Sequence, residues 1–531
     1  MSAKTGPGVY EGGTDLKQRA QAALADDQLR AAVALTTDRL RNGRLRAIEE
    51  LGDWETWRER ARAIRAHTIA HLDYYLGRFA DEVERSGGVV HFCATAEEAV
   101  AVVLGIVREK SARVVAKSKS MVSEEIHLNE ALEREGVAVI ETDLGEYIIQ
   151  LAGEKPSHLI IPAIHRNRQQ IAELFSRVSG ETFPPDTKAL AGYARRRLRE
   201  WFLKADIGLT GCNFGIAESG TITLVSNEGN ARMVTTLPRT HIVVMGMERI
   251  VPTFADVEVM LNMLARSATG QKLTVYTSFI TGPRRRGEAD GPDELHVVVL
   301  DNGRSAQLGD PQFQEVLHCI RCAACLNVCP VYRHIGGHAY GSVYSGPIGA
   351  VLTPLLANDP AGAGELAYAS SLCGACYEAC PVKIPLHDML VYLRGRRVRM
   401  KLTPRGERIA FRLYRRAFTR AEFYRAGVKA TRLMLAPFAR GGRIRRGPGP
   451  LAGWTKSRTL PALPGKTFRE RWKELENEPV EPLVLPTPGM ATSDVSTSGM
   501  PMPGVPTAEG VPSSDASGAA DRPDRSGRNS A

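Results

Sequence analysis

The run His318-Cys319-Ile-Arg-Cys322-Ala-Ala-Cys325-Leu-Asn-Val-Cys329-Pro330 decides the fold of the region around it. Its spacing, C-x2-C-x2-C-x3-C-P, is the bacterial ferredoxin pattern, in which a short loop wraps three thiolates around one four-iron cluster. The fourth cysteine, redirected by the following proline, reaches the other cluster. Ordinary buried thiols would rarely recur at these offsets, and a zinc site would need four ligands and no second group. The run therefore predicts a two-cluster iron–sulfur module.

A second group, Ser370-Ser-Leu-Cys373-Gly-Ala-Cys376-Tyr-Glu-Ala-Cys380-Pro381, has the same frame, with serine where the first cysteine should stand. In two-cluster ferredoxins the first three cysteines of a run bind one cluster, and the fourth cysteine binds the cluster of the other run. Cluster one then receives Cys319, Cys322, Cys325 and Cys380, and cluster two receives Cys329, Cys373 and Cys376. The missing ligand of cluster two stays open between Ser370, Ser371, water, a partner, and a [3Fe–4S] cluster. We expect two iron–sulfur clusters of the [4Fe–4S] type, the second short of one thiolate.

The segment between the two groups favours a helical domain. It holds 43 residues, far more than a minimal ferredoxin uses, and residues 348–356 and 365–372 have helical patterns. We therefore expect a mainly α-helical two-cluster ferredoxin domain over residues 305–395. Cys93 and Cys212 lie outside both groups and are interpreted as plain buried thiols.

Upstream of this domain the pattern predicts an α/β layer over residues 88–304, after a helical N-terminal region at 1–87. Apolar, β-branched runs separated by helical stretches indicate a mainly parallel sheet. The expected strands are 113–116, 137–140, 158–162, 221–226, 241–245, 273–278 and 295–300. Asp301-Asn-Gly-Arg304 supplies the turn that ends the domain, because Asn-Gly tolerates positive φ.

The C-terminal part divides into a basic helical region at 396–485 and a tail at 486–531. Residues 394–446 hold 18 Lys and Arg against two acids, so this segment alone has a net charge of +16. The whole chain has a net charge of +10, so the rest of the chain has −6. That distribution argues against nucleic-acid binding by the whole protein. The basic helix with Phe411, Tyr414 and Phe418 either packs on its own protein or contacts an anionic membrane surface or a partner's groove. The tail is rich in Pro, Gly and Ser without aromatic residues, and is predicted to be disordered.

One further loop is a candidate for chemistry. Residues 211–221, a Gly-rich approach to a strand, could present backbone N–H groups to an anion, with Glu218 as the candidate catalytic residue. The alternative is a structural turn. No Gly-x-Gly-x-x-Gly fingerprint or phosphate-binding Gly-Lys-Ser/Thr loop is present, so nucleotide cofactors are unsupported.

The expected location is the cytoplasm. No apolar run approaches the roughly 20 residues needed to cross a bilayer, and the polar N-terminus lacks the pattern of a secretory signal. Seven of the nine cysteines fall within 62 residues in two tight groups, unlike a secreted disulfide framework.

These pieces together resemble the lactate utilization protein B family, whose members join a LUD domain to a dicluster ferredoxin domain. The resemblance covers roughly residues 30–480. It is carried by Lys117-Ser-Lys-Ser-Met-Val-Ser-Glu-Glu-Ile-His-Leu-Asn129, Glu141-Thr-Asp-Leu-Gly-Glu146, the 211–221 loop, Leu300-Asp-Asn-Gly-Arg304, both cysteine groups and Gly453-Trp-Thr-Lys-Ser-Arg458. Three cysteines in the second group are also the family's pattern.

The family implies a cytoplasmic complex that oxidises L-lactate to pyruvate with two companion subunits, one rich in cysteine and one a second LUD protein. This subunit is then the electron transporter, and its LUD domain is similar to the sugar-phosphate isomerase and CoA-transferase class. Three alternatives stay open. The chain itself binds and oxidises a hydroxy acid in its α/β domain, it serves another 2-hydroxy-acid dehydrogenase, or it belongs to a succinate or fumarate enzyme. The last is weakened because no [2Fe–2S] cysteine set precedes residue 319.

Overall fold

The computed structural model describes residues 9–449 and 451–476 in two compact units, the first ending at Leu413 and the second beginning at Tyr414. The predicted disordered tail, 486–531, lies outside the described residues. In the part of the chain that the structure describes, no helix is long and apolar enough to cross a membrane.

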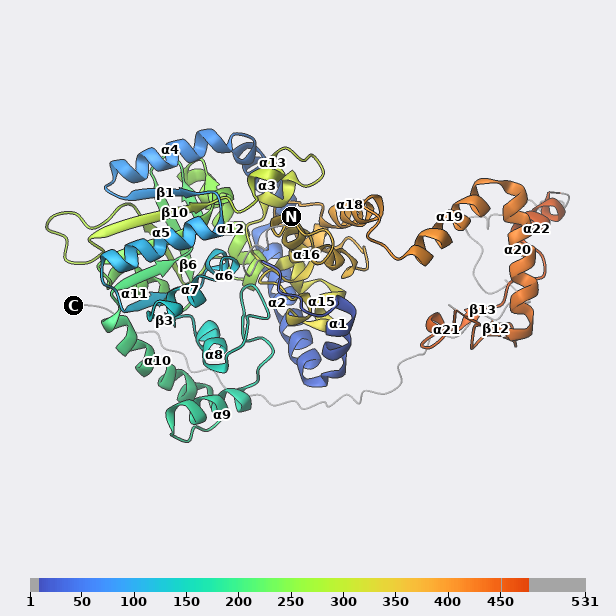
Figure 1. Cartoon of the computed structure of the whole chain (residues 1–531), viewed down its shortest axis with the longest axis horizontal. Coiled ribbons are helices and arrows are strands. Elements are labelled where there is room, and N and C mark those ends of the chain that lie inside the picture. Colours follow the sequence, from blue (N-terminus) through green and yellow to red (C-terminus); the bar gives the residue numbers. More distant parts are fainter. Residues whose placement is uncertain (1–8, 450, 477–531) are drawn as a thin grey trace, which may run out of the picture. The chain divides into compact units, whose positions relative to one another are not determined.

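A six-stranded, all-parallel sheet organises the α/β part of the first unit (Figure 1). Its strand order is β1-β10-β7-β4-β2-β3. The strands are β1 (Val89–Cys93), β2 (Val114–Lys117), β3 (Ala138–Glu141), β4 (Ile207–Thr210), β7 (Thr240–Gly246) and β10 (Glu294–Leu300). These confirm the expected strands at 113–116, 137–140, 241–245 and 295–300, since β-branched residues buried on both faces favour a central parallel strand.

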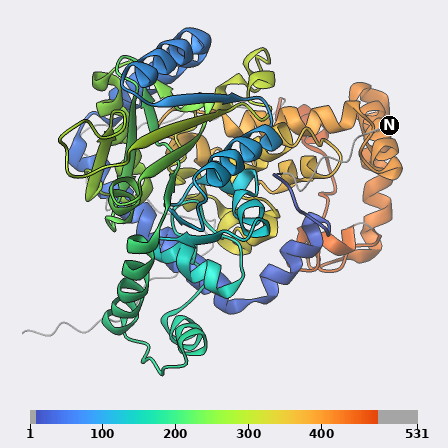
Figure 2. The same cartoon turned by 60° about the vertical axis from the view of Figure 1, so that its left-hand side comes forward.

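Successive side chains of the central strand β7 point to opposite faces of this sheet. Ile242 and Val244 face a core with α5 (Ala96–Glu109) and α7 (Leu128–Arg134), while Val243 and Met245 face a core with α12 (Phe254–Thr269). Helices thus cover both faces of the sheet (Figure 2). The remaining helices of this part are α6 (Met121–Glu125), α8 (Leu144–Ala152), α9 (Arg168–Ser179), α10 (Thr187–Lys204), α11 (Asn230–Thr236) and η1 (Met247–Arg249).

A second, four-stranded sheet with order β8-β5-β6-β9 was not foreseen. It consists of β5 (Phe214–Ile216), β6 (Thr221–Ser226), β8 (Ile250–Val251) and β9 (Tyr276–Ile280). β6 runs antiparallel to β5 and β9, so the strand expected at 221–226 is real but belongs to this second sheet. The strand expected at 273–278 forms further along the chain, as β9.

The expected strand at 158–162 is wrong. These residues form no strand, because the backbone N–H groups of Ile160 and Ile161 donate to the side chain of the buried His158. The Nδ1 of His158 accepts these hydrogen bonds at 3.1 and 3.2 Å. Its Nε2 lies 3.1 Å from the Asn327 amide oxygen in the first cysteine run. This segment therefore links the α/β part to the cysteine region.

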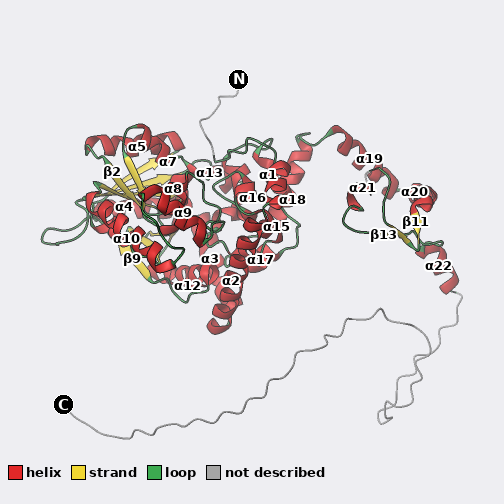
Figure 3. Ribbon diagram, turned by 90° about the horizontal axis from the view of Figure 1, so that it is seen from below, coloured by secondary structure: helices red, strands yellow, loops and turns green. Residues whose placement is uncertain are grey.

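Four helices form the N-terminal region, and those of the cysteine region follow the sheet. The first are α1 (Leu16–Ala25), α2 (Asp27–Leu51), α3 (Trp54–Ala70) and α4 (Leu72–Arg85). The cysteine region has α13 (Ser305–Leu308), η2 (Gln314–His318), α14 (Ala324–Asn327), α15 (Pro330–Ile335), η3 (His338–Tyr340), α16 (Gly346–Leu356), η4 (Ala363–Tyr368), α17 (Ala375–Ala379) and α18 (Leu386–Arg399). Figure 3 shows the contrast between this helical region and the strands of the α/β part.

Helix α19 (Arg405–Thr419) spans the boundary between the units and has no buried residue. The second unit continues with α20 (Ala421–Leu435), η5 (Ala436–Phe438), α21 (Leu451–Trp454) and α22 (Phe468–Leu475). Its antiparallel sheet has the order β11-β12-β13 and consists of β11 (Ala439–Arg440), β12 (Arg443–Ile444) and β13 (Leu460–Pro461). Tyr414 and Phe418 stack at 4.2 Å between ring centroids.

Candidate functional site

The first cysteine loop closes through two left-handed residues. Arg321 and Ala323 have φ of 60° and 61°, a conformation that non-glycine residues adopt rarely and that marks an over-determined, functional turn. The turn directs the backbone N–H of Arg321 to the Sγ of Cys319, at 3.4 Å. Backbone N–H groups that point at a ligand sulfur favour its thiolate form and tune a bound cluster.

The second group repeats this backbone shape. Leu372 and Gly374, which stand where Arg321 and Ala323 stand in the first run, have φ of 56° and 81°. The N–H of Leu372 donates to the Oγ of Ser370 at 3.1 Å, in the same way that Arg321 donates to Cys319. The Ser370 hydroxyl thus occupies the place of the missing first cysteine, while Ser371 is exposed.

One cavity collects the four cysteines expected for cluster one. Cys319, Cys322, Cys325 and Cys380 line one cavity, which is partly open to solvent. The rest of the wall is largely apolar, with Leu159, Ile320, Ala323, Ile348, Val382, Ile384 and Leu386. Four thiols around one largely apolar space are what a four-iron cluster with a full thiolate set requires, so the residues fit that group.

The other three cysteines also interact with one another. Burial raises the pKa of Cys329, and a charge on Cys373 raises it further. Burial likewise raises the pKa of Cys376 to about 12, with contributions from Cys329 and Cys373. Cys373 is exposed, so this end of the cysteine region is open to solvent. Cys329, Cys373 and Cys376 therefore lie close enough to affect one another's ionisation, and Cys376 also raises the pKa of Cys325.

Burial also couples cluster binding to proton release. The pKa of Cys380 is raised to about 11 by burial, and those of Cys322 and Cys325 are raised as well. Because only thiolates ligate iron, these thiols must lose their protons when iron binds. Among the described residues no three His, Cys, Asp or Glu side chains could hold a single metal ion. Cluster thiolates bind different iron atoms and need not converge on one point.

Arginines from the N-terminal helices hold the cysteine loops, a role the sequence reasoning missed. Arg58 of α3 donates from Nε to the carbonyl oxygen of Cys380 at 2.9 Å and from Nη2 to that of Tyr377 at 2.8 Å. Arg44 of α2 donates to the carbonyl oxygen of Ala379 at 3.2 Å, and Arg65 to that of Leu317 at 2.9 Å. Helical patterning shows only that such arginines lie on one helix face, not what they reach.

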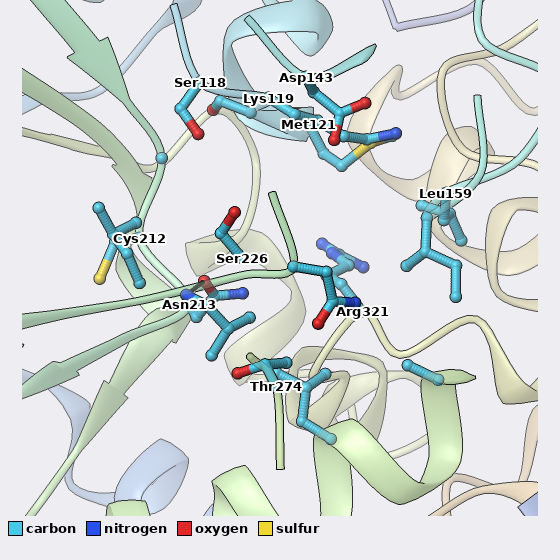
Figure 4. A pocket seen from close by; sticks show the side chains of 18 of the residues that line it. Ser118, Lys119, Met121, Asp143, Leu159, Cys212, Asn213, Ser226, Thr274 and Arg321 are labelled. Atoms are coloured by element: carbon cyan, nitrogen blue, oxygen red, sulfur yellow. Dashed lines mark hydrogen bonds between the residues drawn. The ribbon is translucent and has the colours of Figure 1, made fainter. Parts of the chain in front are cut away.

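Glu218 does not line the pocket of the α/β part that lies beyond the ends of β2 and β4. Its Oε1 accepts the N–H of Phe254 at 2.7 Å, at the start of α12, where a carboxylate favours the helix N-terminus. Other members of the 211–221 loop, Gly211, Cys212 and Asn213, do line that pocket (Figure 4). Cys93 and Cys212 are both buried.

Comparison with known families matches three consecutive segments. The LUD domain model matches residues 76–300, the 4Fe-4S dicluster domain model matches 315–384, and the model of the C-terminal part of lactate utilisation protein B matches 394–477.

Whole-chain relatives carry a consistent name. Lactate utilization protein B of Shouchella clausii is 52% identical over 462 residues, covering 87% of this chain and 97% of the relative. That of Geobacillus thermodenitrificans is 55% identical over 455 residues, covering 85% and 95%. Among solved structures, a DUF162 family protein from Deinococcus radiodurans is 19% identical and covers 43% of this chain and 98% of its own, with a TM-score of 0.23. That score is too low to carry an argument about the fold.

Proposed function

The chain belongs to the lactate utilization protein B family, and we propose that it is the electron-transfer subunit of a complex that oxidises L-lactate to pyruvate. Its dicluster domain holds two [4Fe–4S] clusters, as expected from the cysteine spacing. The clusters supply one-electron transfer when bound. The observation that supports the proposal is that the two cysteine runs lie together, with Cys380 of the second run in the cavity lined by Cys319, Cys322 and Cys325 of the first.

We propose the crossed ligand sets for these clusters. Cys319, Cys322, Cys325 and Cys380 hold cluster one, and Cys329, Cys373 and Cys376 hold cluster two. The shared cavity supports the first set, and the mutual effects of the three remaining thiols on pKa support the second. The chain's own part is to bind both clusters, to exclude water from the first with apolar side chains, and to leave the second near the surface through the exposed Cys373.

The finer assignments are also proposals. The chain works with two companion subunits, one rich in cysteine and one a second LUD protein. The complex lies in the cytoplasm. The LUD domain is similar to the sugar-phosphate isomerase and CoA-transferase class. Contact of α19 with an anionic membrane surface is consistent with Phe411, Tyr414 and Phe418, which are all more than half exposed.

Lactate-dependent reduction tests the proposed function. The chain is co-purified anaerobically with its companion subunits, and the EPR signal of reduced clusters is followed after adding L-lactate, D-lactate or glycolate. We expect L-lactate to reduce the clusters. If no hydroxy acid reduces them while dithionite does, the lactate assignment is wrong and only the carrier role stands.

We further propose that the Ser370 Oγ provides the fourth ligand of cluster two. The backbone after Ser370 has the same left-handed turn as the backbone after Cys319. The Ser370 Oγ accepts a hydrogen bond from the N–H two residues on, as the Cys319 Sγ does. Serine oxygen is a harder ligand than thiolate and binds the soft cluster iron less firmly. This iron should therefore be the first that oxygen removes.

Substitution of Ser370 tests this ligand. In Ser370→Ala, brief exposure to air should convert cluster two to a [3Fe–4S] form faster than in the unmodified chain, as measured by EPR of the oxidised protein. Ser370→Cys should slow that conversion, because a thiolate completes the set. Ser371→Ala, one residue away and exposed, is the matched control. Equal conversion in Ser370→Ala and in the control would exclude Ser370 as a ligand.

A further inference from the structure

A pocket of the α/β part lies at the position where parallel sheets bind ligands. Strands β2 and β4 are neighbours, but the chain leaves β2 toward β3 on one side and leaves β4 toward β7 on the other. Ligands bind outside the carboxyl ends of the strands at such a switch point. The residues that follow β2 and β4 line the pocket: Ser118, Lys119, Ser120, Gly211, Cys212 and Asn213.

Two buried arginines form part of the wall of this pocket. Arg321 lies amid the labelled lining side chains, between Ser226 and Leu159 (Figure 4). Its side chain is 8% exposed, Nη2 bonds Glu248 at 3.2 Å, and Nη1 has no hydrogen-bond partner among the described residues. Arg249, also buried, has one hydrogen-bond partner in the described part of the chain, the carbonyl oxygen of Cys319 at 3.3 Å. Glu248 offsets part of this positive charge, but donors of both guanidinium groups stay unused by the residues that the structure describes, so the two arginines can bind a further anion.

The pocket shares a wall with the cavity of cluster one. Leu159 and Arg321 line both spaces, and Arg321 stands in the chain between the ligands Cys319 and Cys322. Arg249 reaches the backbone of the same loop. A molecule bound to the two arginines is therefore separated from cluster one by little more than one side chain.

Size and charge restrict the ligand. The pocket volume is about 280 Å³, near the lower end for small-molecule sites, and so suits a small acid with water rather than a dinucleotide. Asp143 and Glu228 also line the pocket, and they repel a second negative charge on the ligand. Lys119, a third cation of the wall, is already paired with Glu146 at 2.6 Å. The hydroxyl of Ser118 and the amide of Asn213 add polar groups at the strand ends. A monocarboxylate fits this arrangement better than a dicarboxylate or phosphate.

We infer that this pocket binds a small monocarboxylate with a hydroxyl or oxo oxygen on the adjacent carbon, its carboxylate held by Arg249 and Arg321. This rests on the proposed function, because it gives the electron carrier a site for the 2-hydroxy or 2-oxo acid of the reaction beside cluster one. The bound anion faces the guanidinium groups next to the cluster and lowers the midpoint potential of cluster one, since added negative charge opposes reduction.

Binding of oxamate, a redox-inert 2-oxo monocarboxylate, tests the site. Isothermal titration uses the full chain, purified anaerobically with its clusters verified by iron content, with oxalate and inorganic phosphate as dianionic comparisons. We expect saturable 1:1 binding of oxamate, weaker binding of both dianions, and a more negative midpoint potential of cluster one with oxamate present. Absence of saturable oxamate binding, with both clusters reducible, would overturn the site and leave the electron-carrier role intact.

Four variants locate the binding. Arg249→Gln and Arg321→Gln should each weaken oxamate binding by about tenfold or more, as expected for loss of charge-assisted hydrogen bonds. Thr274→Trp fills the pocket from a half-buried loop position, away from the cysteine loops, and should abolish binding. Arg239→Gln is the matched control, because that arginine is 88% exposed and outside the pocket. Equal affinity in all four variants and the unmodified chain would show that oxamate binds elsewhere and would refute the inference.

Discussion

Cys380→Ser is expected to change the EPR signal of one cluster, the same signal that Cys325→Ser changes, although the two cysteines belong to different runs. The reason is the shared cavity, in which Cys380 lies with Cys319, Cys322 and Cys325. Cys329→Ser, a change in the first run, should instead remove the cluster that Cys376→Ser removes. Cys329→Ser and Cys376→Ser leave cluster two with two thiolates and should lower bound iron by about half, since one of two four-iron clusters is lost. Cys380→Ser and Cys325→Ser leave cluster one with three thiolates and an oxygen, as in cluster two, and should make its fourth iron labile to air. Iron analysis and EPR of the dithionite-reduced protein measure both effects.

The matched control is Cys93→Ser, which changes a buried thiol at the end of β1, outside both cysteine groups. It should keep full iron content and both EPR signals. If Cys380→Ser removed the same signal as Cys329→Ser, the ligands would not be crossed, and the proposed assignment would be wrong.

Arg304→Met is expected to lower the free energy of unfolding by about 3–5 kcal/mol, the usual cost of leaving buried carboxylates without their cation. Arg304 is fully buried and donates to both oxygens of Glu125, at 2.9 and 2.8 Å, and to Glu248 at 2.7 Å. Glu125 in turn accepts from the Tyr344 hydroxyl at 2.6 Å. Glu248 pairs with Arg321. This network joins the α/β part to the cysteine region, so its loss should also loosen the cluster loops. The midpoint of urea unfolding measures the effect.

The dependence of stability on pH provides a second measurement. Burial would raise the pKa of Glu248, but Arg304, Arg321 and Arg249 outweigh it and lower that pKa from 4.5 to about 2. Because this pKa is lower in the folded state, the ionised Glu248 stabilises the fold at pH values above 4.5, its pKa in the unfolded chain. This stabilisation is lost as the pH falls toward 2. Arg304→Met should flatten this acid limb. Adding Glu125→Gln to Arg304→Met should recover part of the stability, because one unpaired charge is removed. Unchanged unfolding in Arg304→Met would contradict a structural role for the network.

Sequence reasoning succeeded where the signal is local. The cysteine spacing specifies a loop of about ten residues, and that loop forms with its two left-handed turns at Arg321 and Ala323. The buried β-branched runs at the centre of the sheet were equally clear, because every residue of 242–245 in β7 and of 297–300 in β10 is apolar and buried. The family and its two clusters followed from these strings and are confirmed by the matched domains.

Sequence reasoning failed where distant residues meet. The turn at His158 was missed because one of the groups that hold its ring, the amide of Asn327, lies 169 positions further along the chain. The pocket arginines, Arg249 and Arg321, belong to different structural regions, and no spacing rule connects them. Glu218 was singled out for its place in a Gly-rich loop, yet its carboxylate bonds the N-terminus of α12, a helix 36 positions further on. Periodicity describes one element at a time and cannot show which elements contact each other.

The most direct test of the central claim, a two-cluster electron carrier, is a reductive titration of the anaerobically purified chain with iron and EPR spin quantified together. The account predicts about eight iron atoms per chain and two reducible centres. About four iron atoms or fewer, or no EPR signal on reduction, would contradict it.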